Sequence, residues 1–363
     1  MIVTVMRMVL RDGLSIAERF CGKQLSLPIV GNILIKTEGQ KLKIQATNLE
    51  LGIEISIPAK ITKEGGITIP PRILSSLLQT LTDEKITLQE KQNTLILETN
   101  SSKSEIRGIP WKDFPIMPLI KGKVRIVIPN TLFINQLNKV LPAVSVNDFK
   151  PEIGGVLFFT DKKVLILAGT DTFRLSEALV KDFNPEEPVS AIIPLRPLQE
   201  LVKIAKPDEE TTITIHEGQA AIETGSARII SRLVGGRYPE YKNLIPKDFS
   251  TTIRVPREEL LDAARLSGAF ASKLNDILLS YRPGHLVVEI VNPEVGKHTR
   301  EIGAKISGKS GRIGFNYRYL SDALETISSK EVSVYLTDET KPALIKDEGD
   351  QTFFTILMPI RIS

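Results

Sequence analysis

The chain has 363 residues, more than one ordinary hydrophobic core needs and enough for several small domains. Hydrophobic residues make up 42% and charged residues 25%, which is typical of a folded globular protein and excludes a disordered chain. The net charge of +4 is far below that of a dedicated basic nucleic-acid binder, so a DNA partner would require locally concentrated charge.

Cysteine and histidine content limits the chemistry of the chain. The single cysteine, Cys21, excludes an internal disulfide, and the three histidines add little material for a structural zinc site. The histidines and carboxylates form no recognisable catalytic constellation. No apolar run reaches the ~18 residues that a membrane helix needs. We therefore expect a cytoplasmic protein that is not an enzyme and holds no metal or cofactor.

The first third of the chain is expected to form a domain over residues 1–121. It begins with a strand, and a helix is predicted over 9–21. Short alternating strands follow, and a second helix is predicted over 72–81. Short strands separated by polar turns indicate an antiparallel sheet with one solvated face.

The second third, residues 122–246, repeats this plan. A helix is predicted near 131–141 and a strand over 156–159. A second helix follows Pro194, where Leu198 and other apolar residues recur at helical spacing. The same succession of elements predicts a second domain of the same kind.

The last third, residues 247–363, has helices predicted over 257–266 and 317–327. It ends in an apolar run that begins at Phe353. Alternation within this run predicts a core strand, and the resemblance described below gives its end a second role.

One motif recurs in all three thirds: an apolar strand meets Pro70, Pro194 or Asn316 and becomes a helix. Pro is tolerated there because the first-turn N–H has no helical partner, and Asn can cap the same donors with its side chain. A period near 120 residues is too long for a solenoid unit, so each copy should be a complete domain. The predicted fold class is α+β, with three repeated domains of two helices packed on antiparallel sheet.

The segment from Gly303 to Ser310 matches the spacing of a phosphate-binding P-loop. A true P-loop opens a helix at its Lys-Ser, whereas Gly311 and strand-like residues follow here, so a hairpin is favoured. A P-loop nucleotide hydrolase remains one alternative function. A DNA-binding module that does not encircle DNA is another.

Several phrases resemble the bacterial sliding clamp family, the beta subunit of DNA polymerase III. They cover all three thirds in order and include Leu27-Pro-Ile-Val-Gly-Asn32, Gly169-Thr-Asp-Thr-Phe-Arg-Leu175, Gly236-Arg-Tyr-Pro-Glu-Tyr241 and Met358-Pro-Ile-Arg361. The resemblance implies a head-to-tail homodimer ring of six similar domains, with helices lining the hole. Such a ring would encircle duplex DNA without reading its sequence and would act as a replication processivity factor.

The resemblance also implies partners and sites. A hydrophobic cleft between domains two and three would bind short peptide motifs of the DNA polymerase III catalytic subunit, the clamp loader and other proteins. Its wall would consist of Ile153, Thr170, Phe173, Arg174, Leu175, Pro239, Leu244, Asn316, Tyr319, Pro342, Ile356, Leu357, Met358, Pro359, Ile360 and Arg361. The candidates for facing DNA are Lys23, Gln24, Arg72, Lys139, Lys150, Arg196, Lys203 and Arg265. The apolar candidates for the dimer interface are Leu77, Ile106 and Leu266.

Overall fold

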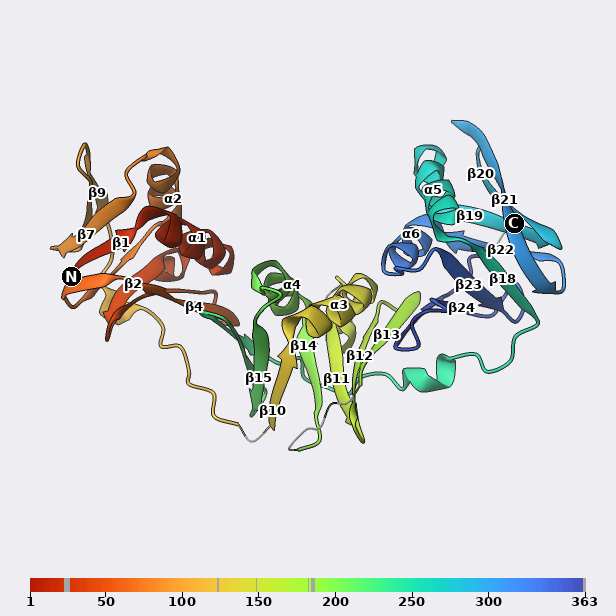
Figure 1. The fold of residues 1–363 in the computed structure, drawn as a ribbon, viewed down its shortest axis with the longest axis horizontal. Helices are drawn as coiled ribbons and strands as arrows, with labels where there is room; N and C mark the ends of the chain where they lie inside the picture. The colour runs from red at the N-terminus through yellow and green to blue at the C-terminus, as the bar shows by residue number, and fades with distance from the viewer. Residues whose placement is uncertain (23–26, 123, 148, 182, 184–186, 362–363) are drawn as a thin grey trace. The chain divides into compact units, whose positions relative to one another are not determined.

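The computed structural model describes residues 1–22, 27–122, 124–147, 149–181, 183 and 187–361 (Figure 1). The chain divides into two compact units. The first contains Met1–Thr131 and Arg196–Leu233, and the second contains Leu132–Leu195 and Val234–Ser363. Among the helices of the described ranges, none is long and apolar enough to cross a membrane.

The order of elements repeats three times along the chain. The first copy comprises β1 (Ile2–Met6), α1 (Arg7–Ala17), β2 (Ile33–Glu38), β3 (Lys41–Thr47), β4 (Leu51–Pro58), β5 (Lys60–Lys63), β6 (Gly66–Ile69), α2 (Pro71–Thr80), β7 (Lys85–Lys91), β8 (Thr94–Glu98) and β9 (Lys103–Arg107). The second comprises β10 (Val124–Pro129), α3 (Asn130–Val140), β11 (Gly155–Asp161), β12 (Val164–Thr170), β13 (Arg174–Val180), β14 (Ser190–Pro194), α4 (Leu195–Ile204), β15 (Glu210–His216), β16 (Gln219–Thr224) and β17 (Ala227–Arg232).

The third copy comprises β18 (Thr251–Pro256), α5 (Arg257–Ser267), β19 (Asp276–Arg282), β20 (Gly284–Asn292), β21 (Gly296–Gly308), β22 (Gly311–Asn316), α6 (Tyr317–Glu325), β23 (Glu331–Leu336), β24 (Ala343–Lys346) and β25 (Phe353–Leu357). Short 3-10 helices include Glu18–Phe20 after α1, Gly268–Phe270 after α5, and Tyr241–Leu244 in the connection before β18. The expectation of repeated helix pairs beside antiparallel strands is confirmed.

The helices are amphipathic and bury one face against the sheets. In α1 the buried residues include Leu10, Leu14 and Ala17, which follow one another at helical spacing. In β1 burial alternates along the strand, as expected for a sheet with one face on a core. Figure 1 shows α1 and α2 together in the red and orange part, and the teal α5 together with the blue α6.

The start of α6 agrees with the prediction made from Asn316. Its side-chain oxygen accepts a hydrogen bond from the Arg318 backbone N–H at 3.0 Å. This bond satisfies one of the first-turn donors that have no partner inside the helix. At the start of α2, Pro70 and Pro71 stand at the same place, and no N–H is needed there.

The first unit contains a five-stranded sheet, ordered β5-β1-β7-β8-β9, and an eight-stranded sheet, ordered β10-β15-β16-β17-β4-β3-β2-β6. The second unit contains a twelve-stranded sheet, ordered β14-β11-β12-β13-β25-β24-β23-β18-β21-β20-β19-β22. All of the pairings are antiparallel.

Two pairings join different copies of the repeat and explain the unit boundaries. β17 of the second copy pairs with β4 of the first, and β25 of the third copy pairs with β13 of the second. Each half of the second copy is therefore hydrogen bonded to a neighbouring copy. The compact units cut through the second copy for this reason, although three domains were expected from the sequence period.

The segment that resembles a P-loop is extended. Gly303 to Gly308 belongs to β21, and β22 begins at Gly311, so no helix opens at Lys309. The expected hairpin is also wrong in detail, because β21 pairs with β18 and β20 whereas β22 pairs with β19. The segment therefore lacks the helix N-terminus with which a P-loop binds phosphate.

Candidate functional site

The C-terminal segment is anchored to two strands of the second unit. β25 pairs with β13, so Arg174 lies opposite Leu357 and Leu175 opposite Ile356. Beyond the strand, the Met358 N–H donates to the Phe173 carbonyl at 2.8 Å. The Ile360 N–H donates to the Gly314 carbonyl, also at 2.8 Å. The backbone of residues 358–360 is therefore held at both ends. Their side chains lie beyond β25 and need not follow the alternation of a strand.

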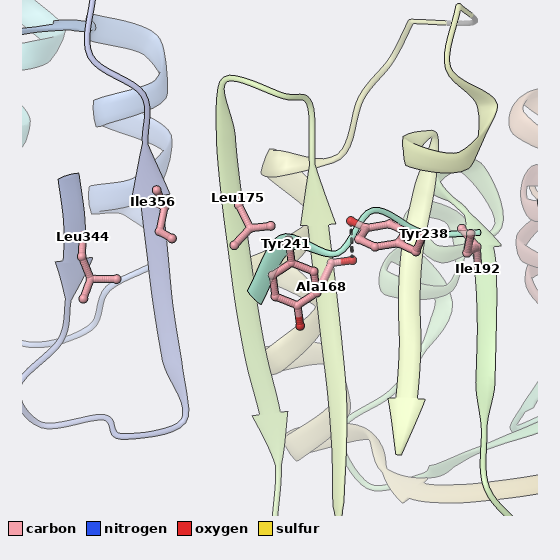
Figure 2. Close-up of a cluster of buried hydrophobic side chains, with 7 residues drawn as sticks. All are labelled: Ala168, Leu175, Ile192, Tyr238, Tyr241, Leu344 and Ile356. Carbon is pink, nitrogen blue, oxygen red and sulfur yellow. Dashed lines mark hydrogen bonds between the residues drawn. The ribbon is translucent and has the colours of Figure 1, made fainter. Parts of the chain in front are cut away.

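A buried apolar cluster lies beneath this segment (Figure 2). It contains Ala168, Leu175, Ile192, Tyr238, Tyr241, Leu344 and Ile356. Figure 2 shows Leu175 and Ile356 on neighbouring strands, with Leu344 on the strand beyond and the two tyrosines on the segment that connects the second and third copies. The cluster joins residues from the second and third copies of the repeat, so it fixes the position of β25.

The two tyrosines of the cluster find polar partners for their hydroxyl groups. Tyr238 donates to the Ala168 carbonyl at 3.2 Å, and Tyr241 donates to the Glu177 carboxylate at 2.5 Å. Their rings pack edge to face at a centroid distance of 6.2 Å. Burial raises the pKa of both phenols, and Glu177 raises that of Tyr241 further. Both side chains are therefore neutral structural groups at physiological pH.

Arg174 is the centre of a polar network at the edge of the cluster. Its Nε donates to Asp171 at 2.9 Å, and its Nη1 donates to Asp322 on α6 at 2.5 Å. The centre of the guanidinium lies 4.3 Å from the ring centroid of Tyr319. A planar guanidinium can stack on an aromatic ring and bind carboxylates in its plane, so Arg174 joins β13 to α6.

Asp171 is a turn residue. Its Oδ1 accepts the backbone N–H groups of Phe173 and Arg174, both at 2.9 Å. The Thr170 hydroxyl donates to the Arg174 carbonyl at 2.7 Å. These bonds hold the backbone that presents Phe173 at the surface.

Exposed apolar side chains surround the buried cluster. Phe173 is 60% exposed, Leu244 64% and Met358 41%. We call these three residues the apolar rim. Exposed large apolar groups next to a fixed backbone segment can anchor a partner peptide, because binding removes them from water at little ordering cost.

The residues expected to form the cleft differ in their contacts and in their exposure to solvent. Leu175 and Ile356 join the buried cluster, and Arg174 and Tyr319 contact each other. Thr170, Ile153 and Leu357 are buried, whereas Asn316, Pro342, Pro359 and Ile360 are partly exposed and Pro239 and Arg361 are exposed. The buried residues can support the site only from beneath.

Sequence reasoning missed several residues that the structure brings to this site, among them two of the buried cluster and one at its polar edge. Tyr241 and Leu344 belong to the buried cluster, and Asp322 binds Arg174. Tyr241 stood within a quoted family phrase and could have been found from it. Asp322 gave no signal, because its partner is distant in the sequence.

The expected DNA-facing residues differ in their availability. Arg72, Lys150, Arg196, Lys203 and Arg265 are exposed. Arg196 donates to the Arg19 carbonyl at 2.7 Å, Lys203 pairs with Glu200, and Arg265 pairs with Glu325. Lys23 and Gln24 lie outside the described residues.

Lys139 does not offer a free ammonium group. Lys139 is 7% exposed, and its Nζ pairs with the Asp350 carboxylate at 2.5 Å. The expectation that it faces DNA is therefore corrected, because a buried and paired ammonium cannot also neutralise a phosphate. Lys139 instead ties α3 to the loop before β25.

The apolar candidates for a dimer interface also differ. Leu266 on α5 is 51% exposed, and Leu77 on α2 is partly exposed. Ile106 is 2% exposed and lies in β9 opposite Leu95, which is also buried. Ile106 is therefore packed against its own chain, and its place at an interface stays a prediction that rests on its strand β9.

Three family models match the chain in succession. Residues 1–118 match the N-terminal domain of the DNA polymerase III beta subunit, residues 127–240 its central domain, and residues 242–361 its C-terminal domain. Across the parts of the chain that the structure describes, no group of three or more His, Cys, Asp or Glu is arranged to hold a metal ion.

Relatives and solved structures agree with the family models. The beta sliding clamps of Synechococcus elongatus and Synechocystis are each 28% identical to this chain, over 97% of both chains. The DNA polymerase sliding clamp of Bacillus subtilis superposes over 100% of both chains with a TM-score of 0.95 and 26% identity. The DNA polymerase III beta subunit of Thermotoga maritima shares the fold, with a TM-score of 0.92, 24% identity and 100% coverage of both chains.

Proposed function

The chain belongs to the DNA polymerase III beta subunit family, and on this premise we propose that it is a DNA sliding clamp. Two copies close head to tail into a ring around duplex DNA. The ring binds the replicative polymerase, the clamp loader and other partners through the apolar rim and the segment 358–360. Its role is mechanical: it keeps a polymerase at its template and has no active site of its own.

The repeated junction between copies carries this proposal. β17 pairs with β4, and β25 pairs with β13, so the last strand of one copy joins the fourth strand of the copy before it. Two equivalent strands are left over: β9 is the last strand of the first copy, and β21 is the fourth strand of the third copy. Within the described ranges, no further strand pairs with the outer edge of β9 or with the outer edge of residues 296–304 of β21. Pairing them between two chains completes a closed head-to-tail ring.

Exposed apolar residues on the helices support the same closure. Ile73 on α2 is 51% exposed, and Leu77 lies one turn further along. Leu201 lies as far from the start of α4, and Ala323 as far from the start of α6, as Leu77 lies from the start of α2. Both of these residues are buried. We infer that α2 of one chain packs against α5 of the other, where Leu266 is exposed.

Sedimentation velocity tests the closure, because a ring of this kind needs two chains. The expected species at micromolar concentration has twice the mass of the 40.2 kDa chain. Trimer or monomer across the whole accessible concentration range would contradict the proposed dimer.

The DNA contact is proposed to be weak and independent of sequence. Arg72, Arg196 and Lys203 are exposed on helices, where they can approach phosphates without reading bases. Direct binding should weaken as salt rises, with a slope set by the number of phosphates neutralised. Tight binding to one short sequence that survives high salt would contradict this part of the proposal.

We also propose the domain limits 1–121, 122–246 and 247–363. The connections between these ranges lie outside the helices and strands, near Gly122 and Pro246. The range 247–363, expressed alone, should unfold cooperatively in urea. A broad, non-cooperative transition would show that it depends on its neighbour and that the limits are misplaced.

A further inference from the structure

The turns that lead into the two junctions between copies carry the same hydrogen bonds. At the first junction, Asn48 Oδ1 accepts the backbone N–H groups two and three residues further along, at 3.1 and 2.8 Å. At the second, Asp171 Oδ1 accepts the corresponding N–H groups, both at 2.9 Å. The residues that follow, Leu49 and Thr172, have φ values of 79° and 78°. The two turns are therefore equivalent, and the residues after them correspond in step.

The strands at the two junctions pair in the same register. Gly52 lies opposite Ile230 at the first junction, and Leu175 lies opposite Ile356 at the second. Gly52 follows Asn48 by as many residues as Leu175 follows Asp171. Gly52 and Leu175 are therefore equivalent, and so are the two isoleucines opposite them.

The backbone bond that fixes the start of the segment 358–360 is also present at the first junction. The Arg232 N–H donates to the Glu50 carbonyl at 3.1 Å, which corresponds to the bond from Met358 to Phe173. The first junction thus repeats the backbone that supports the proposed peptide site. What differs between the two junctions is the side chains.

The connections that cross the two junctions approach their strands differently. Counted from the Pro residue of each connection, Met117 corresponds to Tyr241 and Ile120 to Leu244. Ile120 is 9% exposed and forms a buried cluster with Ile230, against which Met117 packs. Leu244, in contrast, is 64% exposed. The first connection therefore packs onto its sheet at a point where the second presents an apolar side chain to solvent.

Gly52 makes this close approach possible. The Met117 Cε lies 2.5 Å from the place that a Cβ of residue 52 would take. The backbone of Gly52 does not require a glycine, because its φ is not positive. Glycine inside a strand often marks such a close approach. The equivalent Leu175 has a full side chain, which belongs to the buried cluster of the second junction.

The carboxylates two residues further along hold different groups. Glu177 accepts a hydrogen bond from the Tyr241 hydroxyl, which fixes the second connection by a polar contact. The equivalent Glu54 instead accepts a hydrogen bond from Lys43 at 2.8 Å. Met117 has no group that could donate to a carboxylate, so apolar packing holds the first connection at this point.

The rim of the first junction is also less apolar. Glu50 and Arg232 are exposed at the positions where Phe173 and Met358 belong to the apolar rim. A charged pair at these positions does not offer an apolar anchor the contacts that the second junction provides.

We propose that the first junction is a second copy of the peptide scaffold that is closed by its own connection, and that Gly52 and Met117 are the residues that close it. The segment 117–120 covers Ile230 where a partner peptide would approach Ile356. A segment tethered beside its site competes at a high effective concentration, so it excludes a peptide. One chain therefore offers one peptide site although its fold builds the scaffold twice. This inference rests on the proposed peptide site and names what restricts it to the second junction.

The reactivity of a thiol at position 120 measures the closure without any peptide. In a background with Cys21→Ser, Ile120→Cys should react slowly with Ellman's reagent because the side chain at 120 is buried. Adding Gly52→Leu should displace Met117 and raise the rate by about ten-fold or more, since the connection then opens.

Two further variants calibrate the thiol measurement. Gly303→Leu is the matched control for Gly52→Leu, because Gly303 lies in a strand and a Cβ there would meet nothing within 4 Å. It should leave the rate at position 120 unchanged. Leu244→Cys gives the rate of the exposed equivalent at the second junction and should react fast.

A graft tests whether the side chains decide which junction binds a peptide. The chain without residues 358–363, in which the second junction should not bind, receives the side chains of the second junction at four positions: Glu50→Phe, Gly52→Leu, Met117→Tyr and Arg232→Met. Calorimetry should then show about one bound peptide per chain, about ten- to a hundred-fold weaker than in the wild type, because Leu51 stands in place of Arg174. The control carries only Glu50→Phe and Arg232→Met, keeps the connection closed, and should bind none.

The outcomes separate this inference from the proposed peptide site. Slow reaction at position 120 in the Gly52→Leu variant would overturn the closing pair, and this measurement decides the matter if the graft does not fold. A folded graft that binds no peptide, a control that binds as well as the graft, or a wild-type chain that binds two peptides would each contradict the inference. A wild-type chain that binds none would overturn the proposed peptide site instead.

Discussion

Arg174 shows how one residue can join the proposed peptide site to its support. Its guanidinium binds Asp171 on its own turn and Asp322 on α6, and it stacks on Tyr319. The resemblance implied that Arg174 and Tyr319 belong to a cleft, but nothing in the sequence pointed to Asp322. A carboxylate that binds only in three dimensions has no neighbour in the sequence to reveal it.

Tyr319→Ala should weaken binding of a peptide with an apolar clamp-binding motif by about 1 to 3 kcal/mol, because it removes the ring that holds Arg174. Tyr319→Phe keeps the ring and should bind almost as the wild type does. Calorimetry with the same peptide compares them. Equal affinity for the Ala and Phe variants would show that the ring does not contribute.

Cys21 should be unreactive in the folded chain. Burial, with a smaller contribution from Glu18, raises the pKa of its thiol to about 12. Only about one thiol in ten thousand is then ionised at pH 8, and the thiolate is the reactive form. Ellman's reagent should react slowly with the native chain and rapidly in denaturant. Fast reaction under native conditions would show that the thiol is accessible.

At the scale of elements, the C-terminal segment contains the core strand that its alternation predicted, and its role in binding partners stays a proposal. Alternation predicted a core strand, and Ile356 and Leu357 are buried in β25. The resemblance predicted a binding segment, and Met358 is exposed immediately beyond the strand. The change from buried to exposed side chains falls between Leu357 and Met358, where pairing with β13 ends.

Removal of residues 358–363 should abolish peptide binding and leave the dimer and the secondary structure intact, because β25 ends at Leu357. Fluorescence anisotropy with a labelled peptide and circular dichroism provide the two readouts. If the truncation unfolds the last domain, Met358→Ala and Ile360→Ala replace it. Unchanged affinity in a folded truncation would place the partner site elsewhere.

The ion pair between Lys139 and Asp350 should stabilise the second unit in a pH-dependent way. Burial opposes ionisation of Asp350, but hydrogen bonds from Lys139 and Thr352 outweigh it and lower its pKa. A lowered folded-state pKa gives stability that is present above the unfolded-state pKa and is lost as the pH falls through the folded-state value.

Asp350→Asn should therefore reduce the free energy of unfolding at pH 7 by about 1 to 2 kcal/mol, since it leaves Lys139 buried without its partner. The difference from the wild type should shrink as the pH falls below about 4, the ordinary pKa of an aspartate, because the unfolded chain then takes up a proton that folded Asp350 resists. Urea unfolding measures both effects, with the exposed Asp161→Asn as the control. A difference that stays constant down to pH 2 would contradict the pairing.

The sequence predicted repeated elements better than it predicted individual contacts. Pro70, Pro194 and Asn316 marked the helix starts correctly, because local backbone chemistry determines where a helix begins. Lys139 was assigned wrongly, because burial depends on which helices and loops come together. Similarly, the P-loop spacing at Gly303 did not indicate a phosphate site, because the segment forms a strand and opens no helix.

At the scale of the whole molecule, two chains are expected to close through surfaces that a single chain leaves uncovered. Leu77→Asp combined with Leu266→Asp should give folded monomers, because closure would bury two unpaired carboxylates. Ile116→Asp is the matched control, since Ile116 is 95% exposed outside the proposed interface. Sedimentation velocity separates the species. A dimer of undiminished affinity would place the interface elsewhere.

The most direct measurement of the central proposal is retention on DNA of different topology. Protein is loaded onto a nicked circular plasmid, and the complex is separated from free protein by gel filtration before and after cleavage at one restriction site. A ring that holds DNA by enclosing it should stay on the circle at moderate salt and leave once the DNA is linear. Equal retention on circular and linear DNA would contradict a sliding clamp and would indicate a module that binds DNA without encircling it.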